Sequence, residues 1–179
     1  WAKVILRADA RSGVTDHLGE PWAVPVADTQ LDETVTPGAK IGDGTRSAML
    51  AGQITDAQSR LNLTGLVQAG QTLQPQLDAL RRLFELLGIA PALADSVASR
   101  VRSGQRLRVD GVLQPAVLPP LLRLADLASL PGFDPLMVER LEPFAIVLPR
   151  ATPVNVNTAP AEVMAAMIPD LGLSGARRF

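Results

Sequence analysis

Short apolar stretches that open with proline and close with glycine are the feature that most constrains how this chain can fold. The first stretch begins near Pro75 and stops at Gly88. Its large apolar residues recur at helical spacing, at Leu77, Leu80, Leu83, Phe84 and Leu87. Proline fits the first turn of a helix because it has no N–H to leave unpaired, and glycine accepts the conformations that end a helix. The pattern predicts a helix over about 75–87.

The same pattern of proline or capping residues before short apolar stretches repeats downstream and predicts a series of short helices. They run from Pro91 to about Val101, from Pro119 or Pro120 through Leu127, from Asp134–Pro135 to about Glu142, and from Asn157 or Thr158, as cap, through Met167. Asp110-Gly111 between short alternating runs predicts a small hairpin. We therefore predict that most of residues 65–179 is helical, with at least four helices and no large sheet.

Residues 1–64 have a different character and favour a mixed α and β arrangement. A helix over about 1–9 has one apolar face, formed by Trp1, Val4, Ile5 and Ala8. Because this face is already present at Trp1, we expect the helix to begin upstream. Trp22 is the natural burial anchor of an irregular stretch, and residues 28–47 indicate a loop or loose hairpin. Residues 53–56 and 60–63 alternate polar with apolar, as short strands do.

Composition and motifs exclude several classes of function. The chain carries 17 Lys and Arg against 18 Asp and Glu, so it offers no overall attraction to a polyanion. It has no cysteine, so thiolate metal sites and a cysteine nucleophile are excluded. His17, the single histidine, is interpreted as a surface residue, and no phosphate-binding glycine loop occurs. The loop acids Asp28, Asp32, Glu33 and Asp43 match no calcium loop and indicate solvated side chains.

Three stretches together resemble one known family, the GspK-type minor pseudopilins of type II secretion, also called XcpX or HxcX. The first includes Trp1-Ala2 and Asp16-His-Leu-Gly-Glu-Pro-Trp-Ala23. The second is Gly52-Gln-Ile-Thr-Asp-Ala-Gln-Ser-Arg-Leu-Asn-Leu-Thr-Gly-Leu66. The third is Leu141-Glu-Pro-Phe-Ala-Ile-Val-Leu-Pro149 with Pro153-Val-Asn-Val-Asn-Thr-Ala159. Their order and spacing are similar over nearly the whole chain.

The resemblance implies an α+β protein: a pilin-type α/β domain into which a large, mainly helical domain, similar to sterile-alpha-motif domains, is inserted. Residues 1–64 would be part of the pilin-type domain and residues 65–179 the insert. The anchoring helix and the final strands would lie outside this chain. The resemblance also implies a periplasmic, non-enzymatic tip subunit of the pseudopilus, held in the inner membrane before assembly and bound to the I and J minor pseudopilins.

The resemblance implies structural roles for the polar residues of the motifs. Asp56, Arg60 and Asn62 would fix the entry to the helical domain, and Asn155, Asn157 and Thr158 would fix a helix start. Partner contacts would involve Trp1, Val4, Ile5 and Ala8. We expect no catalytic residue, cofactor or metal. Some members of the family bind calcium, but Arg100 and Arg102 stand where its acidic residues would gather, and cations repel a dication.

The sequence leaves two other classes of function open. The turns after Leu130 and Ile168 resemble half of a helix-hairpin-helix, a motif that binds DNA phosphates. Residues 125–179 hold four arginines and six acids, which disfavours this alternative. A small hydrolase is the second alternative, for which no local nucleophile motif is present.

Overall fold

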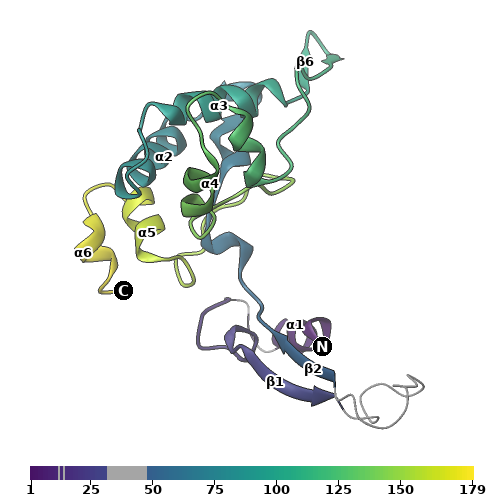
Figure 1. The fold of residues 1–179 in the computed structure, drawn as a ribbon. Helices are drawn as coiled ribbons and strands as arrows, with labels where there is room; N and C mark the ends of the chain where they lie inside the picture. Colours follow the sequence, from purple (N-terminus) through teal and green to yellow (C-terminus); the bar gives the residue numbers. More distant parts are fainter. Residues whose placement is uncertain (12, 14, 32–47) are drawn as a thin grey trace. The chain divides into compact units, whose positions relative to one another are not determined.

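The computed structural model describes residues 1–11, 13, 15–31 and 48–179 (Figure 1). They form two compact units, Trp1–Asp56 and Ala57–Phe179. The division falls before the expected boundary at 64, because Leu61 and Leu63 are buried in the core of the second unit. Among the described residues, no helix is both long and apolar enough to cross a bilayer.

The first unit combines one helix with a two-stranded sheet. Helix α1 (Ala2–Asp9) is followed by the 3-10 turn η1 (Pro21–Ala23), in which Trp22 is buried as expected. Strand β1 (Val26–Leu31) pairs antiparallel with β2 (Ala48–Gly52). Residues 28–31, in the stretch expected to be a loop or loose hairpin, lie in β1, as the hairpin alternative allows. The positions of Asp32, Glu33 and Asp43 lie outside the described residues.

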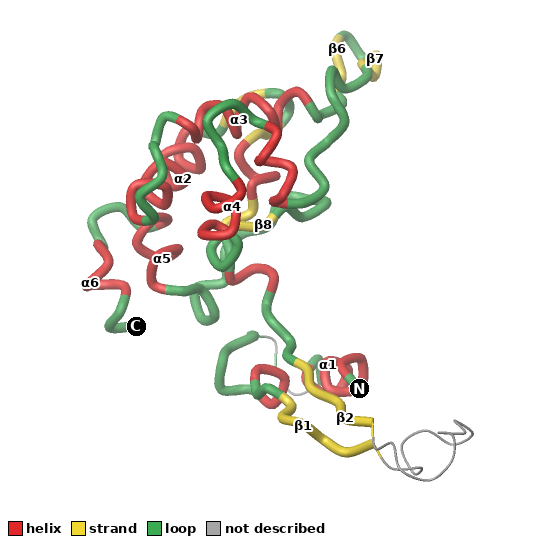
Figure 2. Tube along the Cα trace, in the orientation of Figure 1, coloured by secondary structure: helices red, strands yellow, loops and turns green. Residues whose placement is uncertain are grey.

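The second unit is built from short helices with small strand pairs between them (Figure 2). Its α-helices are α2 (Gln74–Leu86), α3 (Leu93–Ser103), α4 (Pro135–Leu141), α5 (Ala161–Met167) and α6 (Gly172–Ala176). Its 3-10 helices are η2 (Ala57–Ser59), η3 (Leu63–Leu66) and η4 (Leu124–Ser129).

The strand pairs of the second unit are all two-stranded. Strand β3 (Leu61–Asn62) runs parallel to β8 (Ala145–Ile146). Two hairpins complete the set: β4 (Val67–Gln68) with β5 (Gln71–Thr72), and β6 (Leu107–Val109) with β7 (Val112–Gln114). The α+β class, the hairpin at Asp110-Gly111 and the absence of a large sheet in this unit are confirmed.

An aliphatic core holds the second unit together. Phe84 of α2 and Phe133 are its aromatic pair, with ring centroids 6.0 Å apart in an edge-to-face arrangement. Arg81 on α2 lies 2.7 Å from Asp95 on α3, and Arg82 donates from Nε to the carbonyl of Ala166 on α5 at 2.7 Å. Side chains of α2 thus join both neighbouring helices.

Three expectations about helices were wrong in detail. Less than half of residues 65–179 is helical, because extended connections separate the elements. The helix expected from Pro119 or Pro120 is the 3-10 helix η4, which begins later because the Asp126 carboxylate accepts the N–H groups of Leu122 and Arg123. The last long helix begins at Ala161 rather than directly after Asn157 or Thr158.

Candidate functional site

Two segments that are far apart in sequence meet at the entrance of the second unit, and we call this contact the clamp (residues 57–64 with 142–158). The N–H of Leu61 donates to the carbonyl of Phe144 at 2.9 Å, which continues the parallel pairing of β3 and β8. The Thr64 hydroxyl donates to the Leu148 carbonyl at 2.7 Å. The N–H of Asn155 donates to the Gln58 carbonyl at 2.9 Å. The clamp therefore fastens the segment that leads into the helices.

Asn62 is the central side chain of the clamp and is 5% exposed. Its Nδ2 donates to the Arg150 carbonyl at 2.7 Å and to Thr152 Oγ1 at 3.1 Å. Its Oδ1 accepts the N–H groups of Thr64 at 3.2 Å and Leu148 at 3.1 Å. A primary amide has two donor hydrogens and two acceptor lone pairs, so all four positions are used. An aspartate carboxylate, which has the same size, only accepts and could not replace the two donated bonds.

The remaining predicted motif residues lie in the two segments of the clamp or, for Asp56, directly before the first of them in sequence. Arg60 donates to the carbonyl of Glu142 at 3.4 Å, and half-buried Asp56 is the last residue of the first unit. Asn155 Oδ1 accepts the N–H of Asn157 at 3.1 Å, and Thr158 is buried directly after this turn. These three residues shape a turn upstream of α5, with Pro160 between them and the helix. That each has a structural role stays a prediction.

Sequence reasoning missed two members of the clamp, Thr64 and Thr152. Thr64 lies two residues after Asn62, and Thr152 lies three residues before Asn155. Short polar side chains beside a strand end often bond to nearby backbone. Their partners, at Leu148 and Asn62, become visible only when residues more than 80 positions apart are brought together.

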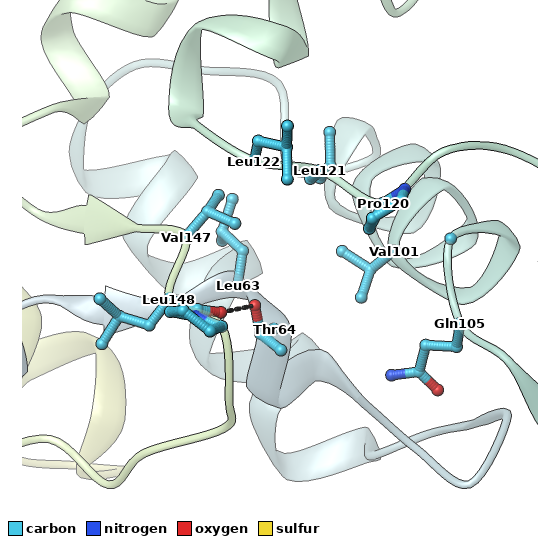
Figure 3. A pocket seen from close by; sticks show the side chains of 11 residues that line it. Leu63, Thr64, Val101, Gln105, Pro120, Leu121, Leu122, Val147 and Leu148 are labelled. Carbon is cyan, nitrogen blue, oxygen red and sulfur yellow. Dashed lines mark hydrogen bonds between the residues drawn. The ribbon is translucent and has the colours of Figure 1, made fainter.

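A hollow of about 330 Å³ lies beside the clamp (Figure 3). Its walls are mainly aliphatic and include Leu63, Val101, Leu121 and Val147. The polar side chains in the wall are committed to backbone groups. Gln105 donates to the Val67 carbonyl at 2.8 Å and accepts the N–H of Gly70 at 3.3 Å, and the Thr64 hydroxyl bonds to Leu148. This hollow therefore resembles a packing gap more than a site for a polar ligand.

The predicted partner face of α1 is divided between covered and open residues. Trp1 lies against Gly52 of β2, since a Cβ built on that glycine would be 3.3 Å from the indole ring. Ile5 is half-buried and faces a hollow beside Glu20 and Pro21. Val4 is 69% exposed, and Ala8 is exposed as well. Among the large apolar residues of this face, Val4 has the highest exposed fraction, and Trp1 is 46% exposed.

His17 and Glu20 form a turn in the first unit. Gly19 N–H donates to His17 Nδ1 at 3.1 Å, and the Glu20 carboxylate accepts the His17 N–H and the Trp22 indole N–H, each at 2.8 Å. These two bonds hold the pKa of Glu20 below its usual value. Desolvation, followed by the charges of Glu20 and Asp16, raises the pKa of Asp9. The histidine thus shapes a turn.

Acidic side chains of the described residues gather around this turn. Carboxylate oxygens of Asp9, Asp16 and Glu20 lie within 4.8 Å of one another. Such clusters are common without an ion, and we assign no metal to this one. The residues at the end of α3 do not fit the calcium site of the resembled family, because Arg100 and Arg102 are cations and Arg102 donates to Thr72 at 2.7 Å.

The first of the two turns that suggested a DNA-binding hairpin packs closely against a helix. Gly132 has a φ of +89°, and a Cβ on it would lie 2.8 Å from the Leu93 side chain. The glycine lets the turn pack closely against α3.

Comparisons with known proteins decide the family. Residues 59–150 match the family model of type II secretion system protein K, and residues 154–179 match a second model of the same description. The chain belongs to the type II secretion system protein K family. The first of these matches includes residues 59–64 and 142–150 of the clamp.

Two individual proteins illustrate the relationship. This protein K family member is 29% identical to the type II secretion system protein K of Pseudomonas aeruginosa, over 93% of its own length and 52% of that protein. Its fold is similar to a chain in the crystal structure of the GspK-GspI-GspJ complex from enterotoxigenic Escherichia coli, with a TM-score of 0.66 at 19% identity. That match covers 92% of this chain and 61% of the other. The chain therefore spans between half and two thirds of the proteins it matches.

Proposed function

We propose that this chain is the periplasmic part of a minor pseudopilin, a structural subunit at the pseudopilus tip that supports protein export across the outer membrane. Membership of the protein K family, over residues 59–150, carries the proposal. The role is structural rather than enzymatic, because the motif residues bond to backbone and to one another. The protein works in the periplasm and is anchored in the inner membrane before assembly.

The domain organisation follows from the same proposal. Residues 1–64 belong to a pilin-type domain, and residues 65–179 form a helical domain inserted into it. The clamp supports the position of the entry, because it fixes the segment just before residue 65 to the interior of the helical domain. Asn62, on the entering segment, and Arg150, far along the chain, are 2.7 Å apart, donor to acceptor.

The partners under this proposal are the I and J minor pseudopilins of the same system. The similar Escherichia coli chain comes from a GspK-GspI-GspJ complex, which supports the choice of partners. The exposed part of α1 is the proposed contact surface. Burial of apolar surface stabilises such contacts by roughly 25 cal/mol per Å², before the costs of association are subtracted. Val4, with 69% of its surface open, is the residue best placed to contribute.

Co-expression of the soluble I, J and K domains tests the proposal. We expect a 1:1:1 complex by size-exclusion chromatography with light scattering at micromolar concentration. Val4→Asp should weaken it, whereas Val24→Asp, a matched change at a valine that is 62% exposed in the same unit, should not. Failure of the unmodified domains to associate would contradict the proposed function. Equal effects of the two variants would move the contact surface away from α1.

A further inference from the structure

The second unit exposes an unusual run of aliphatic side chains on and after the β6–β7 hairpin. We call residues 106–122 the hairpin patch. Figure 1 shows the hairpin projecting from the helices of this unit, with a long connection returning to them. Its exposed large apolar residues are Val112 (60%), Leu113 (53%), Val117 (85%), Leu118 (45%) and Leu122 (78%). Contiguous exposed apolar residues mark interaction surfaces far more often than single ones do.

The charge around the patch is one-sided. Residues 100–123 contain five arginines and one acid, although the whole chain has a net charge of −1. Arg106 and Arg108 lie on the hairpin and are exposed. The patch is therefore complementary to a partner that combines acidic and aliphatic side chains, because arginine pairs with carboxylates while the leucines and valines need apolar cover.

The hairpin also has an edge at which a further strand can pair. Its turn residues, Asp110 and Gly111, have φ values of 49° and 80°, as in a type I′ turn. Val109 and Val112 flank the turn and exchange hydrogen bonds, so the next pair, Arg108 and Leu113, is the non-bonded pair of the ladder. The backbone N–H and C=O of Leu113 consequently point away from β6. Strand addition at such an edge is a common mode of peptide recognition.

The hairpin is held to the unit well enough to present this edge. The tip of Leu107 lies against Gly70, since a Cβ on that glycine would be 2.8 Å from it. Arg108 donates to the carbonyl of Gly111 at 2.9 Å and stiffens the turn. The returning segment is fixed where Leu118 N–H donates to the Ser103 carbonyl at 2.9 Å. Pro115, Pro119 and Pro120 restrict the backbone of that segment further.

A membrane surface fits these features less well than a protein does. Asp110 is exposed at the tip of the hairpin, where it would enter an anionic headgroup layer before the apolar residues. Like charges repel there, and a carboxylate is costly to move into an apolar layer.

We propose that the hairpin patch binds an extended segment of a partner protein, which pairs with the free edge of β7 and alternates acidic with aliphatic side chains. Arg108 is paired with Leu113 and shares its face of the hairpin, so the acids lie on that face beside Arg106 and Arg108. The aliphatic side chains of the added strand cover Val112 on the opposite face. The surface belongs to the second unit alone, so the proposal does not depend on how the chain binds other pseudopilins.

Binding of short synthetic peptides to the full chain tests this proposal. One peptide alternates glutamate with valine and the other alternates lysine with valine. We expect the acidic peptide to bind at least about tenfold more tightly, since each tenfold step needs only about one charge-assisted contact. Hydrogen exchange at Val112–Gln114 should slow when it binds. Equal affinity for both peptides, or unchanged exchange in β7, would overturn the proposal.

Matched variants separate this surface from general effects of charge and hydrophobicity. Arg106→Glu with Arg108→Glu should reverse the preference between the peptides. Arg177→Glu with Arg178→Glu, an equal change of net charge at exposed positions, should not. Val112→Ser should weaken acidic-peptide binding about fivefold to tenfold, whereas Val24→Ser, at a valine that is 62% exposed in the first unit, should leave it unchanged.

Two further measurements decide between occupants. Sedimentation of the chain with phosphatidylglycerol vesicles, and its self-association by analytical ultracentrifugation, are each repeated with Val112→Ser. Vesicle binding that this change removes would overturn the proposal in favour of a membrane. Self-association that it removes would overturn it in favour of a second copy of the chain.

Discussion

The side-chain amide of Asn62 lies 2.7 Å from the carbonyl oxygen of Arg150, a residue 88 positions later. Its other partners are Thr152, Thr64 and Leu148, so this one side chain joins the segment that enters the helical unit to a segment beyond α4. Because Asn62 is buried, water cannot easily replace its amide as the hydrogen-bond partner of these groups.

Replacing Asn62 should destabilise the second unit. Asn62→Ala leaves buried donors and acceptors unpaired, which costs about 1–3 kcal/mol in the free energy of unfolding. Asn62→Asp should cost more at neutral pH, since a carboxylate would face the carbonyl of Arg150 in place of an N–H. Urea unfolding followed by circular dichroism measures both. Gln68→Glu, the same amide-to-carboxylate change at an exposed position, is the control and should change stability little. Equal stability of Asn62→Ala and the unmodified chain would contradict a clamping role.

The sequence predicted the helices best where the apolar periodicity agreed with the proline and glycine residues at the helix ends. Pro75 and Gly88 placed α2 within two residues, because its buried face repeats over several turns. The region after Pro119 was misjudged, since leucines at helical spacing do not reveal that Asp126 captures the Leu122 and Arg123 N–H groups and delays the start. Propensity is local, whereas such competition depends on the fold around it.

The clamp could be predicted only in part for a similar reason. Asn62 stood out through its place beside a strand and through the family resemblance. Its partners at Arg150 and Thr152 could not be derived, because hydrogen bonds across such a separation depend on the tertiary fold. The division of the α1 face was equally hidden, since helical spacing groups Val4 with Ile5 but does not show which of them the unit covers.

Gly104 should tolerate no side chain, although its backbone is right-handed helical. A Cβ there would lie 2.8 Å from Pro120 Cα, and proline backbone cannot move aside as a side-chain tip can. Gly104→Ala should therefore cost about 1–3 kcal/mol, as overpacking does. At Gly65 the nearest atom would be 3.9 Å away, so Gly65→Ala should be neutral or slightly stabilising. Thermal unfolding of the two variants provides the comparison, and equal melting temperatures would refute the close contact.

Calcium should not stabilise the second unit. Arg100 and Arg102 end α3, and their charge disfavours a dication nearby. We expect melting temperatures of the second unit, followed by circular dichroism, to be the same with calcium and with a chelator. If calorimetric titration of the full chain detects heat of calcium binding, this heat should disappear in Glu20→Gln. Its loss would assign the binding to the acidic cluster of the first unit. A stabilisation that survives Glu20→Gln and is lost on chelation would show that the arginines do not exclude the ion.

The pH dependence of the first unit should reveal opposite contributions from Asp9 and Glu20. The pKa of Asp9 is raised by desolvation and then by neighbouring acids, so its favourable contribution exists at low pH and is lost as pH rises through the folded pKa. Asp9→Asn should therefore raise the melting temperature at neutral pH and have little effect below about pH 3.5, where the carboxyl is protonated in both states.

Glu20 provides a control in which the change in melting temperature should have the opposite sign. Its pKa is lowered by the His17 N–H and then by the Trp22 indole, so its contribution exists at neutral pH and is lost as pH falls through the folded pKa. Glu20→Gln should accordingly lower the neutral-pH melting temperature that Asp9→Asn raises. Trp22 fluorescence, measured in a Trp1→Phe background, reports on this unit because its indole N–H bonds to Glu20 at 2.8 Å. If Asp9→Asn lowered the melting temperature at pH 7, the ionised Asp9 carboxylate would stabilise the folded unit. The pKa of Asp9 would then be lowered by folding, which contradicts the raised pKa.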